Sequence, residues 1–118
     1  DLVTANDAGE NGPSLSILRN RGAGSYFPET RRNVGSGYLL HDLAAGDFNG
    51  DGVDDVAVAV DDIGELSSVV LVFRNNGSGT LANPADYPIL GGFFPQCLEA
   101  VDVTGDGILD LVMCHTFG

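Results

Sequence analysis

The feature that most constrains this chain is an internal repeat with a period of 55 residues. The segment Asp47–Asp55 recurs as Asp102–Asp110 with the same pattern of aspartate and glycine, and Arg19–Gly24 recurs as Arg74–Gly79. Both pairs of segments have the same offset, which indicates that one supersecondary unit is used more than once. Such units bury their apolar faces by stacking on their neighbours, so the repeat predicts an array rather than an isolated domain.

Each period contains four segments that have the composition of β-strands. In the complete copy they lie at about 39–46, 55–60, 68–75 and 81–90, between an Asp-rich loop and turns rich in Gly and Asn. The continuous apolar run Val69–Phe73 is typical of a strand that is buried on both faces. No segment keeps a helical period. The pattern predicts an all-β fold in which antiparallel four-stranded blades form a β-propeller-like array, with about two blades in this chain.

The repeat also predicts how the chain is divided. Residues 1–54 are expected to form repeat 1, a partial blade plus the start of the next, and 55–109 form repeat 2. Residues 110–118 begin a third repeat. About two blades leave strand edges open at both ends, and open edges favour association. We therefore expect the chain to be a segment of a larger array, or a unit that joins copies of itself.

The Asp-rich loops have the spacing of a calcium site. Side-chain oxygens at positions 1, 3, 5 and 9 and a backbone carbonyl at position 7 can surround one hard cation, and calcium accepts about six to eight oxygens. A third, partial site is predicted at Asp1, which matches position 9. The predicted ligands are Asp47, Asn49, Asp51, the Val53 carbonyl and Asp55 in the first loop, and Asp102, Thr104, Asp106, the Ile108 carbonyl and Asp110 in the second.

Two alternatives to this interpretation are an EF-hand and a pair of metal-free Asx turns. An EF-hand loop requires Glu at position 12, where this chain has Val58 and Met113, and its flanking segments would be helical. The EF-hand is therefore excluded. Asx turns alone remain an alternative, because Asp and Asn form them without metal. In the second loop Thr104 replaces Asn at position 3, so weaker binding is expected there.

The Asp-x-Asn-x-Asp-Gly-x-x-Asp loop, followed by a Val-Ala-Val-like strand, resembles the FG-GAP/VCBS repeat family. That family includes the blades of integrin α-subunit propellers and of related fungal and bacterial lectins. The turn at Arg74–Leu81 resembles the family's Asn-x-Gly-x-Gly-Thr-Phe turn, and the resemblance covers essentially the whole chain. It implies calcium ligands at the ten positions given above. Such propellers usually close with about seven blades, and this chain has only two periods.

The two cysteines flank the second loop. If the strands on either side pair symmetrically, so that Val101 faces Asp110, then Cys97 faces Cys114 within disulfide range. The prediction is a disulfide, with two buried free thiols as the alternative. A disulfide implies an oxidising compartment, and we therefore expect a secreted or cell-surface protein. Asn76-Gly77-Ser78 is a candidate N-glycosylation site on a predicted exposed turn.

The charge of the chain and its motifs limit the classes of function that it could have. The net charge is −12, and all five basic residues are arginine. So acidic a surface repels phosphate backbones and anionic lipids, and neither nucleic acid nor membrane insertion is expected. No nucleophile motif or acid–base pair predicts an enzyme. The leading prediction is an extracellular, calcium-stabilised structural or adhesive repeat module that could serve as the building unit of a fibre or of a longer repeat protein. A carbohydrate-binding, lectin-like propeller segment is the alternative. The expected partners are further repeats, copies of the chain, glycans or extracellular proteins.

Overall fold

The chain folds entirely into β-strands, turns and loops in the residues that the structure describes. The structure is a computed structural model, and it describes residues 1–7 and 12–117. No helix long and apolar enough to cross a membrane occurs in these residues. The strands are β1 (Leu2–Asn6), β2 (Ser14–Leu18), β3 (Asn20–Gly22), β4 (Ser25–Tyr26), β5 (Thr30–Asn33), β6 (Tyr38–Gly46), β7 (Asp55–Asp62), β8 (Ser67–Phe73), β9 (Ala85–Ile89), β10 (Phe93–Val101) and β11 (Asp110–Phe117).

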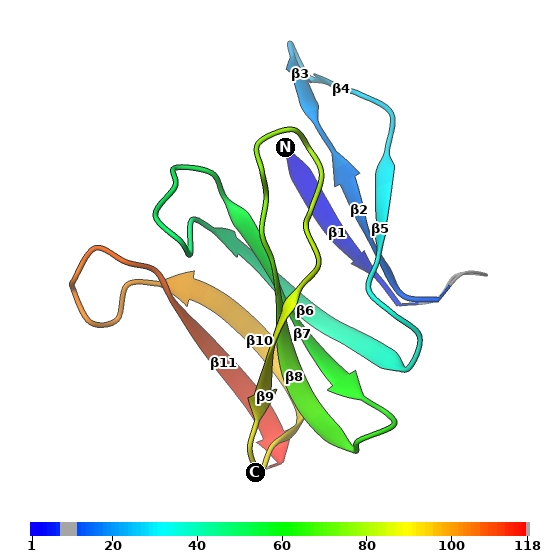
Figure 1. Ribbon diagram of the computed structural model, residues 1–118, viewed down its shortest axis with the longest axis vertical. Coiled ribbons are helices and arrows are strands. Elements are labelled where there is room, and N and C mark those ends of the chain that lie inside the picture. The colour runs from blue at the N-terminus through cyan, green and yellow to red at the C-terminus, as the bar shows by residue number, and fades with distance from the viewer. Residues whose placement is uncertain (8–11, 118) are drawn as a thin grey trace.

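Antiparallel pairing arranges these strands in three stacked sheets. The first sheet has the order β1-β2-β5, the middle sheet β6-β7-β8-β9, and the third consists of β10 and β11. A small hairpin of β3 and β4 projects from the first sheet (Figure 1). The middle sheet lies between the other two, since β1 contacts β6 on one side and β10 contacts β6 and β7 on the other (Figure 1). The predicted all-β architecture of antiparallel blades is therefore confirmed.

The four strands predicted for the complete copy correspond to β6, β7, β8 and β9. The bounds of the first three agree with the prediction within two residues, and the last differs most, because it begins at Ala85 and not at residue 81. Leu81 makes a single bridge with Asn75, and Pro84 has no N–H to donate to a ladder. The segment 82–84 therefore runs as a loop before β9 starts.

The middle sheet is buried on both faces because small and large apolar residues alternate along β7. Val56, Val58 and Val60 face the first sheet, where they form a core with Leu15 and Phe73. On the opposite face, Ala57 and Ala59 pack with Val70 and Leu98 against the third sheet. Each face therefore stacks on a neighbouring sheet, as the continuous apolar run predicts.

The outer face of the first sheet is polar. Ser14 and Ser16 occupy β2 positions that correspond, at the repeat offset, to Val69 and Leu71 of the middle sheet. Asn6 donates a hydrogen bond to the Ser16 hydroxyl, which in turn donates to Glu29. The first sheet thus presents an apolar face to the middle sheet and, on its other face, buried serines of which Ser16 is hydrogen-bonded to Asn6 and Glu29.

Candidate metal centre

The first Asp-rich loop, residues 47–55, connects β6 to β7 and is organised around Asp47. The Asp47 carboxylate accepts hydrogen bonds from three backbone N–H groups of its own loop, those of Gly50 (2.7 Å), Asp51 (3.1 Å) and Gly52 (2.8 Å). Asn49 Oδ1 accepts the Asp51 N–H at 2.9 Å, and Asp51 Oδ1 accepts the Val53 N–H at 2.9 Å. The side chains at positions 1, 3 and 5 therefore hold the backbone in a tight ring.

Two glycines make this ring possible. Gly50 and Gly52 have φ values of 79° and 85°, in the left-handed region that L side chains rarely adopt. Their counterparts Gly105 and Gly107 have φ values of 77° and 86°. A Cβ at any of these positions would meet no neighbouring atom, so the requirement for glycine comes from the backbone conformation alone.

The second loop, residues 102–110, repeats the same network at the 55-residue offset. Asp102 accepts the N–H groups of Gly105 (2.7 Å), Asp106 (3.2 Å) and Gly107 (2.8 Å), and Asp106 Oδ1 accepts the Ile108 N–H at 2.9 Å. At position 3, the Thr104 hydroxyl lies 3.4 Å from Asp102 Oδ1. Thr104 thus donates to a neighbouring carboxylate, whereas Asn49 presents an oxygen that accepts from the backbone.

Position 9 links two of the repeats to another turn of the fold, whereas Asp110, at position 9 of the second loop, accepts the Val103 N–H of its own loop at 3.1 Å. Asp55 is 1% exposed, and its Oδ1 accepts the backbone N–H of Asn75 at 2.8 Å. Asp1 Oδ1 accepts the N–H of Asn20 at the same distance, and Asn20 is the repeat counterpart of Asn75. Sequence reasoning did not assign a role to Asn20 or Asn75. Their shared place in the repeat, next to the recurring arginine, is the signal that could have found them.

The backbone hydrogen bonds also change the acidity of the first aspartate in each loop. The pKa of Asp47 is lowered, chiefly by the N–H of Gly52 and also by those of Gly50, Asp51 and Asn49. The pKa of Asp102 is lowered in the same way, chiefly by the Gly107 N–H. Hydrogen bonds to an ionised carboxylate favour the charged form. Both side chains are therefore held as anions.

The donor set of the first loop suits calcium, although its side chains are not gathered around one point. Three carboxylates, one amide and one backbone carbonyl supply only hard oxygen ligands, which is the chemistry calcium prefers. Among residues 1–7 and 12–117, no three His, Cys, Asp or Glu side chains are placed together as a metal-binding group. Asn49 donates its amide N–H to Asp55 Oδ2 at 3.2 Å. Calcium binding would therefore require Asn49 and the carboxylates to turn toward a common point.

The other predicted site residues lie as follows. Cys97 and Cys114 face each other in the β10–β11 ladder and form a disulfide, with a Cα–Cα distance of 5.2 Å. Val101 pairs with Asp110, as the symmetric register predicts. Asn76 is exposed on the turn after β8, where its side-chain oxygen accepts hydrogen bonds from the Ser78 backbone (3.0 Å) and the Ser78 hydroxyl (2.6 Å).

These observations define a class of protein: an all-β array of stacked antiparallel sheets in which an Asp-rich loop recurs once per period. The comparison with protein families is specific. A model of the FG-GAP-like repeat matches residues 1–58 and again residues 59–113, so the chain belongs to the FG-GAP-like repeat family. The repeat boundaries at 54 and 109 remain a prediction. Searches among curated proteins and among solved structures found no match.

Proposed function

We propose that the chain is an extracellular structural or adhesive repeat module that calcium stabilises. The observation that carries this proposal is the identical hydrogen-bond network around Asp47 and Asp102 in two loops that lie one period apart. The three backbone N–H donors to Asp47 and the three to Asp102 occupy the same positions in both loops, which favours a function that both loops share. The family membership supports a repeat module, and the loops give that module a cation-dependent element.

Calcium would reduce the repulsion among clustered charges. Asp47, Asp51 and Asp55 bring three carboxylates into nine residues of loop, and Asp55 is almost fully buried. The residues that would hold the ion are those at positions 1, 3, 5, 7 and 9 of each loop. Because the ligands come together only in the folded loop, binding free energy adds to folding free energy.

The disulfide supports a location outside the cell. Cys97 and Cys114 are paired, and structural disulfides persist in oxidising compartments such as the extracellular space. The exposed sequon at Asn76 is compatible with that location. Mass spectrometry of the native protein, before and after enzymatic deglycosylation, tests whether Asn76 carries a glycan.

The test of calcium stabilisation is thermal unfolding with calcium, with magnesium and with a chelator. At a free calcium concentration of about 100 times Kd, one site would add about 2.7 kcal/mol to the free energy of unfolding. The double variant Asp47→Ala/Asp102→Ala is expected to lose the response. Asp54→Asn is the matched control, since Asp54 lies in the loop but outside the ligand positions. Equal melting temperatures in calcium and chelator would refute the proposal.

Carbohydrate binding is the alternative function and stays a prediction. An exposed aromatic ring can stack on a sugar, and Phe94 is 49% exposed. A glycan array in calcium tests this alternative, and specific binding that is lost in Phe94→Ala would favour it over a purely structural role.

A further inference from the structure

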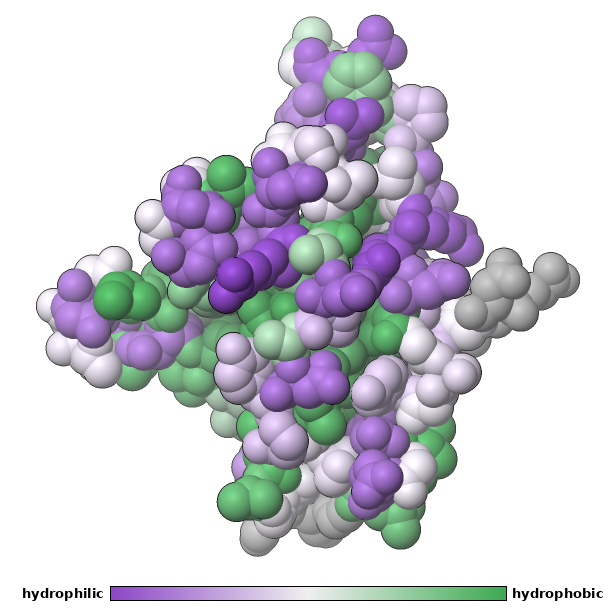
Figure 2. Space-filling model, viewed as in Figure 1, coloured by the Kyte–Doolittle hydropathy of each residue, from purple (hydrophilic) through white to green (hydrophobic). Residues whose placement is uncertain are grey.

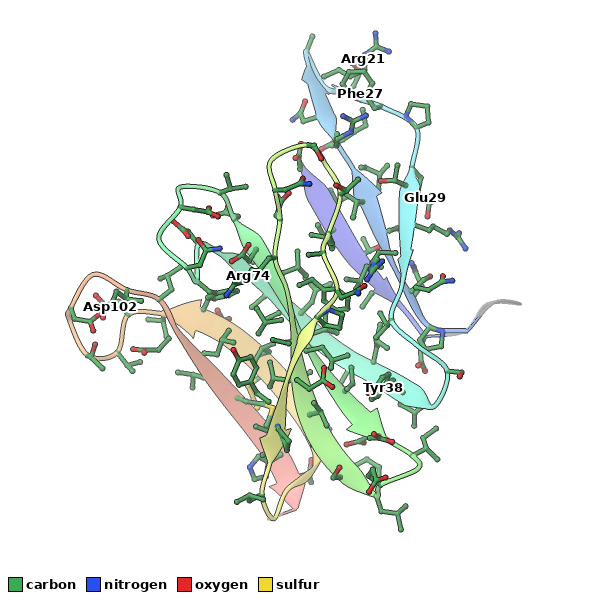
Figure 3. The ribbon with its side chains drawn as sticks, viewed as in Figure 1. Arg21, Phe27, Glu29, Tyr38, Arg74 and Asp102 are labelled. Atoms are coloured by element: carbon green, nitrogen blue, oxygen red, sulfur yellow. A yellow bond between two sulfur atoms is a disulfide. The ribbon has the colours of Figure 1, made fainter. Side chains whose placement is uncertain are left out.

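The two Asp-rich loops lie side by side in the fold. Residues of both, among them Asp47, Asn49 and Ile108, line one cavity between them. Figure 2 shows the loops as neighbouring projections that are hydrophilic on the outside, with hydrophobic surface where they join the sheets. Figure 3 labels Asp102 in the second loop, and the first loop lies next to it. Two loops this close can influence each other through the side chains that meet between them.

The loops meet at Gly46, a buried residue at the end of β6. A Cβ on Gly46 would lie 2.6 Å from Leu109 Cδ1 and 3.5 Å from Phe48 Cε1 and from Ala100 Cβ. Carbon atoms in contact stand about 3.5–4.0 Å apart, so Leu109 packs directly against the Gly46 backbone. One side chain from each loop, Phe48 and Leu109, therefore lies against the same glycine.

Both of these side chains stand between predicted ligand positions. Phe48 is at position 2 of the first loop, between ligand positions 1 and 3, and Gly46 directly precedes position 1. Leu109 is at position 8 of the second loop, between ligand positions 7 and 9. The planar peptide unit that contains the position-7 carbonyl also contains the Leu109 nitrogen. A shift of either side chain therefore moves backbone that presents ligands in its own loop.

Leu109 differs in exposure from the other apolar residues of its loop. Val103 and Ile108 are 63% and 59% exposed, whereas Leu109 is half-buried. The first loop has Asp54 at position 8, and that residue is exposed. The inward-facing leucine is therefore a property of the second loop, and the repeat as such does not require it.

Both loops have to rearrange before they can hold a cation. In the first loop, Asn49 Nδ2 donates to Asp55 Oδ2 at 3.2 Å. In the second loop, Asp110 Oδ2 accepts the Val103 N–H at 3.1 Å. Each loop thus has its present arrangement and another in which these oxygens turn toward a common point. A close-packed contact favours the same arrangement in both loops, because a mismatch would leave a gap or an overlap at Gly46.

We propose that Leu109, packed on Gly46 beside Phe48, couples the two calcium loops, so that filling the first loop raises the calcium affinity of the second. Once the ligands of the first loop are fixed, Gly46 and Phe48 present a fixed surface to Leu109. The position-7 carbonyl and Asp110 on either side of Leu109 then lose less freedom on binding. We expect a coupling factor of about five. This inference rests on the proposed calcium binding, and it states how one site regulates the other.

Charge alone would couple the loops with the opposite sign. The first loop contains four aspartates and the second contains three. A dication in one loop reduces the negative potential at the other, and so weakens the attraction for a second dication. Added salt screens this effect, since the Debye length falls from about 10 Å at 0.1 M to about 3 Å at 1 M. A second-loop affinity that rises when the first loop is filled, and still rises at high salt, is therefore a sign of packing.

Calcium titrations followed by NMR test the inference, with the amide signals of Gly52 and Gly107 reporting the two loops. Each of these N–H groups donates to the first aspartate of its loop at 2.8 Å. Asp51→Asn removes a carboxylate from the first loop but keeps the side-chain oxygen that accepts the Val53 N–H. The first loop of this variant should stay empty while the second is titrated, which the Gly52 signal checks. Its second-loop Kd should be about fivefold higher than that of the wild type.

Substitutions of Leu109 separate coupling from a purely structural role. With Leu109→Ala, the second-loop Kd should be the same with and without Asp51→Asn. Leu109→Met keeps an apolar contact of similar volume and should keep most of the fivefold ratio. Val103→Ala is the matched control, because it shortens an exposed apolar side chain of the same loop and should leave the ratio unchanged. If Leu109→Ala raised the Kd equally in both backgrounds and left the ratio unchanged, the inference would be overturned.

Gly46→Ala tests the same contact from the first loop. Its added Cβ would displace the Leu109 side chain, so the variant should also lose the coupling. Equal second-loop Kd values in the wild type and Asp51→Asn, with calcium bound in both, would overturn the inference and leave the calcium-stabilised module standing. Amide signals that do not respond to calcium in either loop would overturn both.

Discussion

Asp47 holds three backbone N–H groups of its own loop, and Asp102 holds the three that correspond to them. This ring could be predicted in part from the sequence, because the Asp and Gly spacing marks a tight loop with oxygens at fixed positions. The link from Asp55 to Asn75 could not be predicted from spacing alone. It joins residues 20 positions apart, and it depends on how two turns meet at one end of the sheet.

Position 3 is the difference between the two loops, and it yields the first prediction. Thr104→Asn should tighten calcium binding by the second loop, because an amide oxygen replaces a hydroxyl that donates to Asp102. We expect about a tenfold lower Kd for that site, measured by isothermal titration calorimetry. The reciprocal change Asn49→Thr should weaken the first site. A Thr104→Asn protein with the wild-type Kd would show that position 3 does not bind the ion.

Glu29 gives a pH prediction. Its pKa is lowered, first by the hydrogen bond from Ser16 and then by Arg31. A carboxyl whose folded pKa is depressed adds stability above its unfolded pKa of about 4.3, and that stability is lost as the pH falls through the folded value. Glu29→Gln should therefore melt below the wild type at pH 7, and this difference should shrink toward pH 3. Differential scanning calorimetry measures it, and a difference that stays constant with pH would contradict the assignment.

The β6–β7 and β10–β11 hairpins are equivalent in the repeat, but different interactions stabilise them. In β6–β7 the position of the cystine is occupied by Asp42 opposite Ala59, and in β10–β11 by Cys97 opposite Cys114. Asp42 Oδ2 accepts the Leu98 N–H at 2.8 Å, so this position in the first hairpin binds the next sheet instead of its own partner strand. The middle sheet gains support from both neighbours. The third sheet is instead cross-linked by its own disulfide.

Reduction of the disulfide should therefore destabilise the third sheet. The bridge spans 17 residues of sequence, and closing a loop of about that length in the unfolded chain is worth about 3 kcal/mol. We expect Cys97→Ala/Cys114→Ala to lower the free energy of unfolding by about that amount, measured in urea. Hydrogen exchange should show the largest loss of protection in β10 and β11. Equal loss across all sheets would mean that the bridge has no local role.

At the scale of elements, the sequence predicted the strands β6 to β9 and the cystine register, because alternation and a symmetric loop leave few ways to pair. It placed the start of β9 four residues early. Leu81 and Ala82 could extend a strand, but Leu81 makes a single bridge with Asn75, and Pro84 cannot donate to a ladder. Pro84 was therefore a local signal against the predicted start, and the bridge at Leu81 depends on the path of the loop.

The whole molecule is a stack of three sheets, and its stability depends mostly on the middle one. Leu71 is fully buried in the core between the first and middle sheets. Leu71→Ala should lower the free energy of unfolding by about 2–5 kcal/mol. Both sheets should unfold together, because they share that core. Ile63→Ala, at a side chain that is 53% exposed, is the control and should change stability by no more than about 0.5 kcal/mol.

The stacking of the sheets could be predicted from the sequence, but the side-chain contacts on the outer sheets could not. A repeat with a strand buried on both faces requires neighbours on both sides, which fixes the order of the layers. The polar face around Ser16 depends on which side chains meet across different elements. The stacking of Arg19 and Arg21 on Phe27 is a further case, since these side chains come together only when the β3–β4 hairpin closes.

The hydrogen bond between Asp55 and Asn75 makes the turn after β8 a reporter position. Any rearrangement of Asp55 changes the support of the Asn75 backbone, and the exposed residues that follow it extend into solvent. A fluorophore attached through a cysteine at Ser78 would register the state of a loop more than twenty residues upstream without touching it. The Asp-rich loop would thus change state on binding, and the turn after β8 would report that change.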